Sequence, residues 1–112
     1  MTVIEAIARE EGYGVPGAIP TRDNNPGDIV YGSFAKAHGA IQDGRFAKWP
    51  SSEDGFVAMR ALLLEHYVGL TLGEALNKWA PPIENNTSSY TANVCKWTGL
   101  TPETVLTAEL IG

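Results

Sequence analysis

With 112 residues, of which 44% are hydrophobic, the chain has the length of one domain and enough apolar side chains for one core, so we expect a single domain over residues 1–112. The formal net charge of −5 argues against nucleic acid as a partner, because nucleic-acid binding needs a basic surface. No apolar stretch reaches the roughly 18 residues that a membrane span needs.

Residues 1–12 do not resemble a signal peptide, because they lack a basic start and charged side chains interrupt the apolar run. We therefore expect a protein made without an export signal, or one whose signal has been removed. The lone Cys95 excludes an internal disulfide, and His38 and His66 stand in no metal-ligand pattern. We expect no cofactor and no metal.

The first half of the chain is predicted to hold one helix, a loop and a small β element. Residues 2–11 form the helix, which Thr2 and Glu5 open with a capping box and Gly12 and Gly14 stop. Residues 12–28, rich in Gly, Pro, Asn and Asp, predict a long ordered loop. Apolar runs at 29–31 and 45–49, with a turn signal at Asp43-Gly44, predict a hairpin or a three-stranded sheet.

The second half is predicted to be helical. A helix starts within residues 51–54, and its apolar side chains extend nearly all round over 54–68, which predicts a helix buried in the middle of the domain. Further helices are predicted from their start and stop signals at residues 71–80, at 87–98 and from Thr101-Pro102 onward. The predicted fold class is α+β, mostly helical.

Glu11 is the candidate catalytic acid. On a helical wheel at about 100° per residue, it lies near the centre of the apolar stripe of the first helix, and Glu10 lies at the edge. A helix C-terminus and desolvation both disfavour a charged carboxylate and raise its pKa, as a general acid that acts near neutral pH requires. The alternative is a frayed helix end with a solvated carboxylate.

Several blocks of sequence, weak alone, are more specific in their order and spacing. The blocks are Glu11-Gly12, Arg22-Asp23-Asn24-Asn25-Pro26-Gly27-Asp28-Ile29, Arg45-Phe46-Ala47, Glu53-Asp54-Gly55, Trp79-Ala80-Pro81-Pro82, Glu84-Asn85-Asn86-Thr87 and Tyr90. Together they resemble the phage-type lysozyme-like family of virion proteins and wall-degrading enzymes, bacteriophage endolysins included. Asp28 departs from the asparagine expected there.

The resemblance implies a lysozyme-like fold, with a cleft between a helical lobe and a small β element. It implies cleavage of the β-1,4 bond between N-acetylmuramic acid and N-acetylglucosamine, by hydrolysis or lytic transglycosylation, with Glu11 as general acid. The implied partner is the peptidoglycan glycan strand. We expect a monomer that acts at the bacterial cell wall, either phage-encoded or virion-associated.

The remaining site residues are candidates with alternatives. A second carboxylate would be Asp23, Asp28 or Glu84, and without one the 6-hydroxyl of the muramic acid would attack. Five residues are expected to bind sugar, with a turn, a helix cap or core packing as the alternative role: Asn24, Asn25, Tyr31, Asn85 and Tyr90. The alternative functions are a non-catalytic wall-binding or virion structural module of the same fold, and a helical protein-interaction domain.

Overall fold

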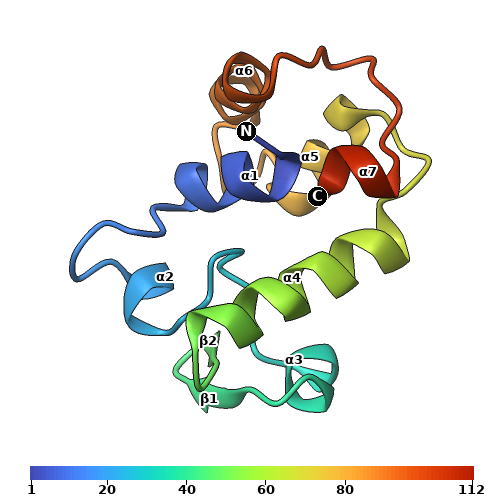
Figure 1. Cartoon of the computed structure of the whole chain (residues 1–112). Helices are drawn as coiled ribbons and strands as arrows, with labels where there is room; N and C mark the ends of the chain where they lie inside the picture. The colour runs from blue at the N-terminus through green and yellow to red at the C-terminus, as the bar shows by residue number, and fades with distance from the viewer. The chain divides into compact units, whose positions relative to one another are not determined.

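The computed structural model describes all 112 residues and contains seven helices and one two-stranded antiparallel sheet (Figure 1). The chain is therefore mostly helical with a small β element, as the sequence predicts. In chain order the elements are α1 (Val3–Glu11), α2 (Ile19–Arg22), α3 (Ser33–Ala37), β1 (Ile41–Asp43), β2 (Phe46–Lys48), α4 (Ser52–His66), α5 (Leu72–Trp79), α6 (Thr87–Thr98) and α7 (Ala108–Ile111).

The chain divides into two compact units. One consists of Ile7–Ala61 and is called the 7–61 unit. The other, called the 62–112 unit, consists of Leu62–Gly112 together with Met1–Ala6. Helices α1 and α4 each contribute residues to both units.

The 7–61 unit contains the β element. Strands β1 and β2 pair with Gln42 opposite Ala47, and the residues 44–45 form the two-residue turn between them. The predicted run 29–31 adds only a single bridge, from Val30 to Phe46, so the three-stranded alternative is wrong. Two short helices, α2 and α3, lie where the sequence predicted no helix. The hydrophobic core around the β element consists of five buried residues: Ala35, Ala40, Ala47, Trp49 and Ala58.

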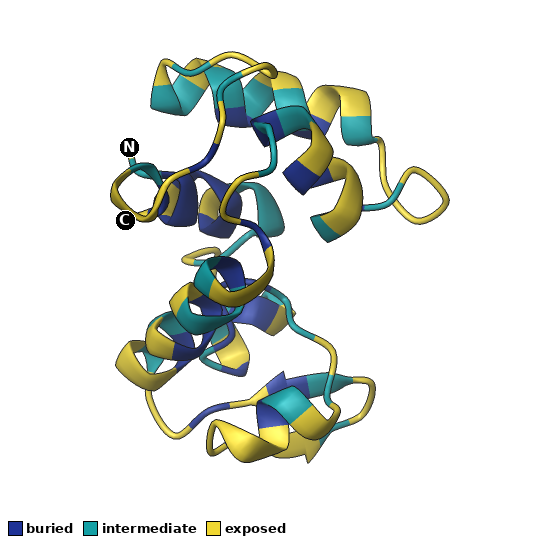
Figure 2. Ribbon diagram, turned by 90° about the vertical axis from the view of Figure 1, so that its right-hand side faces the viewer, coloured by how far each residue is buried: buried dark blue, intermediate teal, exposed yellow.

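Helix α4 has a solvent-exposed side, which corrects the expectation of a helix buried all round. Ala58, Met59 and Leu63 are buried, whereas Val57 is 62% exposed. Val57 lies three or four residues from Glu53 and Arg60, so it shares their polar side of the helix. In Figure 2, dark blue alternates with teal and yellow along the helices. No helix combines the length and apolar composition that a membrane crossing needs.

The 62–112 unit follows the predicted helix signals up to Gly99. The capping box of Thr71 and Glu74 opens α5, and Asn86 caps α6 by accepting a hydrogen bond from the backbone N–H of Ser89. Helix α6 ends at Gly99, whose φ of 76° is the left-handed conformation that glycine adopts easily. Helices α5 and α6 pack against each other.

The predicted helix opened by Thr101-Pro102 is wrong. This segment makes a turn and then runs beside residues 69–73, because Leu106 donates to the carbonyl of Leu70 and Leu72 donates to that of Thr104. The last helix, α7, begins later, after the cap residue Thr107. Backbone pairing with a segment about 30 residues earlier thus overrides the local proline signal.

Candidate functional site

Helix α1 places Glu11 at a defined position. The helix opens with the predicted capping box, in which Glu5 and Thr2 exchange hydrogen bonds of 2.8 and 3.2 Å. It ends in a Schellman motif after Glu11: Gly12 has a φ of 92°, and the N–H of Tyr13 donates to the carbonyl of Ala8 at 3.0 Å. Glu11 is therefore the last residue of a helix that is fixed at both ends.

The exposure of Glu11 agrees with the helical wheel, but it does not single Glu11 out. The apolar stripe is buried, with Val3 and Ile7 each 1% exposed. Glu11 is half-buried beside it, and so is Glu10, whereas Arg9 is exposed. Only a functional comparison of the two glutamates can distinguish their roles.

The segment after Glu11 is held in place by α2 and α4. The Thr21 hydroxyl accepts a hydrogen bond from the N–H of Gly14 at 2.9 Å and donates to the carbonyl of Gly12 at 3.5 Å. The ring of Tyr13 meets that of Phe56 edge-on, with centroids 5.2 Å apart. Thr21 is a positioning residue that the sequence analysis missed, because no local pattern pairs it with Gly12.

Asn24 and Asn25 begin the segment of residues 24–28, called the Asn-rich loop from here on, and both make hydrogen bonds that hold the fold. The Asn24 side chain donates to the carbonyl of Trp49 at 3.0 Å, and its φ is 51°. Asn25 has no exposed surface; both of its amide N–H groups donate at 2.9 Å, to the carbonyls of Ile29 and Ala47. Its oxygen accepts from the N–H of Ile29. The expectation that Asn25 binds sugar is corrected to a structural role, since its donors are used inside the protein.

Asp23 forms a charged cluster with Arg22 and Asp43. The guanidinium of Arg22 contacts the Asp23 carboxyl at 3.4 Å and the Asp43 carboxyl at 3.0 Å. Asp23 is buried, and its Oδ2 has no hydrogen-bond partner when Asp23 and Asp43 are both ionised. Protonation of Asp23 supplies a partner, because the protonated carboxyl can donate a hydrogen bond to the Asp43 carboxylate.

The pKa values of this cluster move in opposite directions. Burial raises the pKa of Asp23, the neighbouring Asp43 raises it further, and Arg22 lowers it in part. The hydrogen bond with Asp23 lowers the pKa of Asp43, and Arg22 adds to that effect. Because Asp23 has no exposed surface, it cannot reach a sugar or an attacking water in this conformation, which counts against it as the second carboxylate.

Asp28 is the half-buried carboxylate of the loop. Its φ is 50°, a left-handed conformation in which Asn and Asp are both enriched, so the departure from the expected asparagine is compatible with the backbone. Burial raises the pKa of Asp28, and Arg45 opposes that shift. Its Oδ1 is buried without a hydrogen-bond partner.

The other sugar-binding candidates differ in exposure. Tyr31 is half-buried and packs against the core of the β element in the 7–61 unit. In the 62–112 unit, Tyr90 is only 5% exposed and packs in the core, which is the alternative role expected of it and leaves little of its surface for a sugar contact. Glu84 and Asn85 are exposed.

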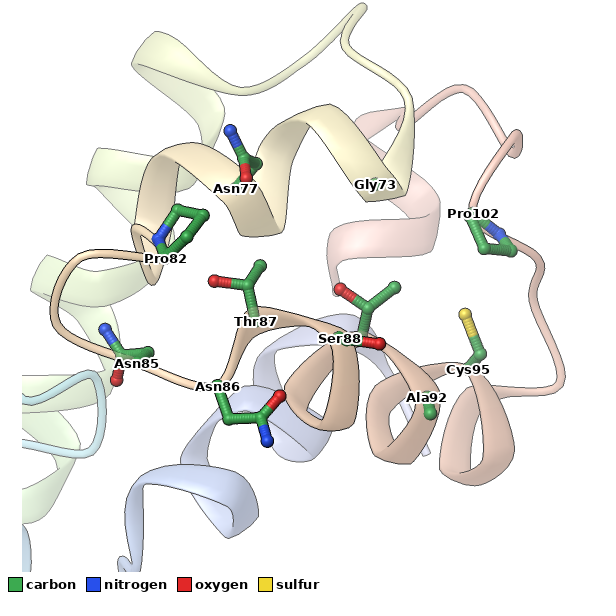
Figure 3. Close-up of a pocket in the computed structure, with 11 residues that line it drawn as sticks. Gly73, Asn77, Pro82, Asn85, Asn86, Thr87, Ser88, Ala92, Cys95 and Pro102 are labelled. Carbon is green, nitrogen blue, oxygen red and sulfur yellow. The ribbon is translucent and has the colours of Figure 1, made fainter.

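Asn85 lines a pocket of 720 Å³ within the 62–112 unit, called the α5–α6 pocket from here on. Its walls come from α5, residues 82–88, the following turns of α6, and Pro102 (Figure 3). No local sequence pattern predicts this pocket, because its lining is spread along the chain from Gly73 to Pro102.

The structure contains no group of three or more His, Cys, Asp or Glu side chains placed to hold a metal ion. Comparison with known proteins adds no assignment: no protein-family model matches the chain, and no curated protein is similar to it at a significant level.

Proposed function

We propose that this protein is a peptidoglycan glycosidase of lysozyme-like fold that cleaves the β-1,4 bond between N-acetylmuramic acid and N-acetylglucosamine. The observation that carries the proposal is the position of Glu11. It is a half-buried carboxylate that ends an amphipathic helix and is followed by a fixed turn. Rigid placement of this kind suits a catalytic acid, because proton transfer depends on alignment with the leaving oxygen.

In the proposed reaction, Glu11 gives its proton to the glycosidic oxygen as the bond from that oxygen to the muramic acid C1 breaks. The cation-like C1 is then attacked by water or by the 6-hydroxyl of the same sugar. In both cases the attacking oxygen loses a proton, and the Glu11 carboxylate can accept it. Of the two candidate second carboxylates in the 7–61 unit, Asp23 is buried, whereas Asp28 has exposed surface from which to assist an attacking water.

The test compares Glu11→Gln with Glu10→Gln on purified peptidoglycan. Both glutamates are half-buried near the end of α1, so each variant controls for the structural effect of the other. Glu11→Gln keeps size and hydrogen bonding but loses the transferable proton, so the lytic rate should fall by about 10²–10⁴-fold. Glu10→Gln should keep most of its activity, and melting temperatures measured on both proteins report on folding.

Two results would overturn the proposal. Full lytic activity in Glu11→Gln would remove Glu11 from the chemistry. Wild-type protein that binds peptidoglycan without releasing fragments would instead favour the non-catalytic wall-binding module. Mass spectrometry of released fragments then decides the route, because an anhydro end and a reducing end differ by one water.

A further inference from the structure

The α5–α6 pocket is a second candidate binding site, and it lies in the unit that does not contain Glu11. Its volume of 720 Å³ falls within the range of about 300–1,000 Å³ that is typical of small-molecule sites. The pocket is therefore large enough for a small ligand, and its lining indicates which kind.

The polar lining has hydrogen-bonding groups to spare. The side chains of Asn77, Ser88 and Thr91 line the pocket and make no hydrogen bond with another protein group. Asn85 uses one amide N–H in a long bond of 3.4 Å to the carbonyl of Pro81. These groups offer both donors and acceptors.

One end of the pocket is apolar and the other carries amides. Figure 3 places the side chains of Ala92, Cys95 and Pro102 at the apolar end. The amides of Asn77 and Asn85 lie at the other end, with the ring of Pro82 between them. The thiol of Cys95 is directed from α6 toward Pro102. Burial raises the pKa of this thiol, and the negative charge of Glu103 adds to the effect, so the apolar end stays uncharged at neutral pH.

None of the lining residues is charged, so a charged ligand would find no counter-ion there. The net charge of −5 further disfavours anions. The lining therefore fits a neutral molecule that combines hydroxyl and amide groups with an apolar portion. An acetamido sugar has this combination, with its hydroxyls, its amide and its methyl group.

We propose that the α5–α6 pocket binds an N-acetylglucosamine-type sugar of the glycan strand, with the acetyl methyl toward Cys95 and the hydroxyls toward Asn77 and Asn85. This inference builds on the proposed function, because it assigns to the same glycan a second point of attachment. Such a site raises the local concentration of the strand without taking part in bond cleavage.

The test uses Cys95 as a reporter, since it is the only cysteine in the chain. The rate of its reaction with N-ethylmaleimide is measured in the full-length protein, with and without N,N′,N″-triacetylchitotriose. At a sugar concentration ten times the Kd, about one-eleventh of the sites remain free, so the reaction should slow about tenfold. The same measurement on Glu11→Gln excludes effects of sugar cleavage. Maltotriose, which lacks acetamido groups, should not protect Cys95.

A matched pair of variants ties the protection to the pocket. Ser88 lines it, whereas the adjacent Ser89 does not, although both are exposed on α6. Ser88→Ala should raise the half-protecting sugar concentration about two- to tenfold, the value of one hydrogen bond, and Ser89→Ala should leave it unchanged. Melting temperatures of both variants show whether a change in the protecting sugar concentration comes from weaker binding or from a folding defect.

The outcomes distinguish this inference from the proposed function. If the sugar does not protect Cys95 but lysis depends on Glu11, sugar binding in the pocket is refuted and the proposed enzyme is not. If the sugar protects Cys95 but the protein has no lytic activity, the pocket is supported and the proposed enzyme is refuted. Equal protection by maltotriose, or equal effects of Ser88→Ala and Ser89→Ala, would also refute acetamido-sugar binding in this pocket.

Discussion

Gly55→Ala should destabilise the protein, although alanine is the better helix former. A β-carbon at position 55 would lie 1.9 Å from the carbonyl oxygen of Asn24 and 3.0 Å from Cδ of Pro26. The shortest ordinary C···O contacts are about 3.3 Å, so α4 and the Asn-rich loop must separate by roughly 1.4 Å. Because the nearest atom is the backbone carbonyl oxygen of Asn24, rotation of a side chain cannot relieve the contact.

The size of the effect follows from three terms. Overpacking typically costs about 1–3 kcal/mol, and the separation strains the 3.0 Å bond from Asn24 to Trp49, worth about 1 kcal/mol. Replacing a helical glycine by alanine returns about 1 kcal/mol. The net loss is about 1–3 kcal/mol, which corresponds to a fall in melting temperature of roughly 4–12 °C at about 4 °C per kcal/mol.

Thermal unfolding followed by circular dichroism measures this effect, with Val57→Ala as the control on the same helix. Val57 is 62% exposed, so its truncation should change stability by no more than about 0.5 kcal/mol. Equal melting temperatures for the two variants would refute the close approach of Gly55 to Asn24.

Three further outcomes are expected. Asn25→Ala removes three hydrogen bonds and leaves the carbonyl of Ala47 and the N–H of Ile29 without the partner that Asn25 supplies, so chemical denaturation should show a loss of about 3 kcal/mol, at about 1 kcal/mol for each bond. Thr71→Ala removes the capping box of α5 and should cost about 0.5–2 kcal/mol by the same measurement. The raised pKa of Asp23 means that its contribution to stability is present below its ordinary pKa of about 4 and is lost as pH rises through the higher folded-state pKa. Asp23→Asn should therefore gain melting temperature relative to wild type as pH rises above about 4, and a constant difference would contradict the assigned shift. The lowered pKa of Asp43 acts in the opposite sense, at lower pH.

Within the candidate site, the periodicity of nine neighbouring residues predicted that Glu11 ends the first helix beside its buried stripe, but it did not predict that Glu10 is half-buried as well. It did not predict the bonds of Thr21 to Gly12 and Gly14, or the contact of Tyr13 with Phe56. Those contacts join residues that share no local pattern.

The sequence by itself determined the helices that carry their own start and stop signals. The Thr2 and Thr71 capping boxes and the glycines 12 and 99 act within a few residues, so their hydrogen bonds can be predicted without knowledge of the fold. Tertiary structure decided the rest. The C-terminal segment pairs with Leu70 and Leu72 instead of forming a helix at Thr101, because the backbone groups of that distant segment satisfy its own.

The same reason gives Asn25 a structural role in place of the sugar contact expected of it, and it ties the side chain of Asn24 to the fold. An Asn-Asn-Pro-Gly sequence is compatible with a sugar contact or with a turn, and its composition alone does not choose between them. The fold brings the carbonyls of Ala47 and Trp49 to these side chains from more than 20 residues away, and it uses their amides there. Burial depends on what the rest of the chain places around a residue, so only the tertiary structure could decide it.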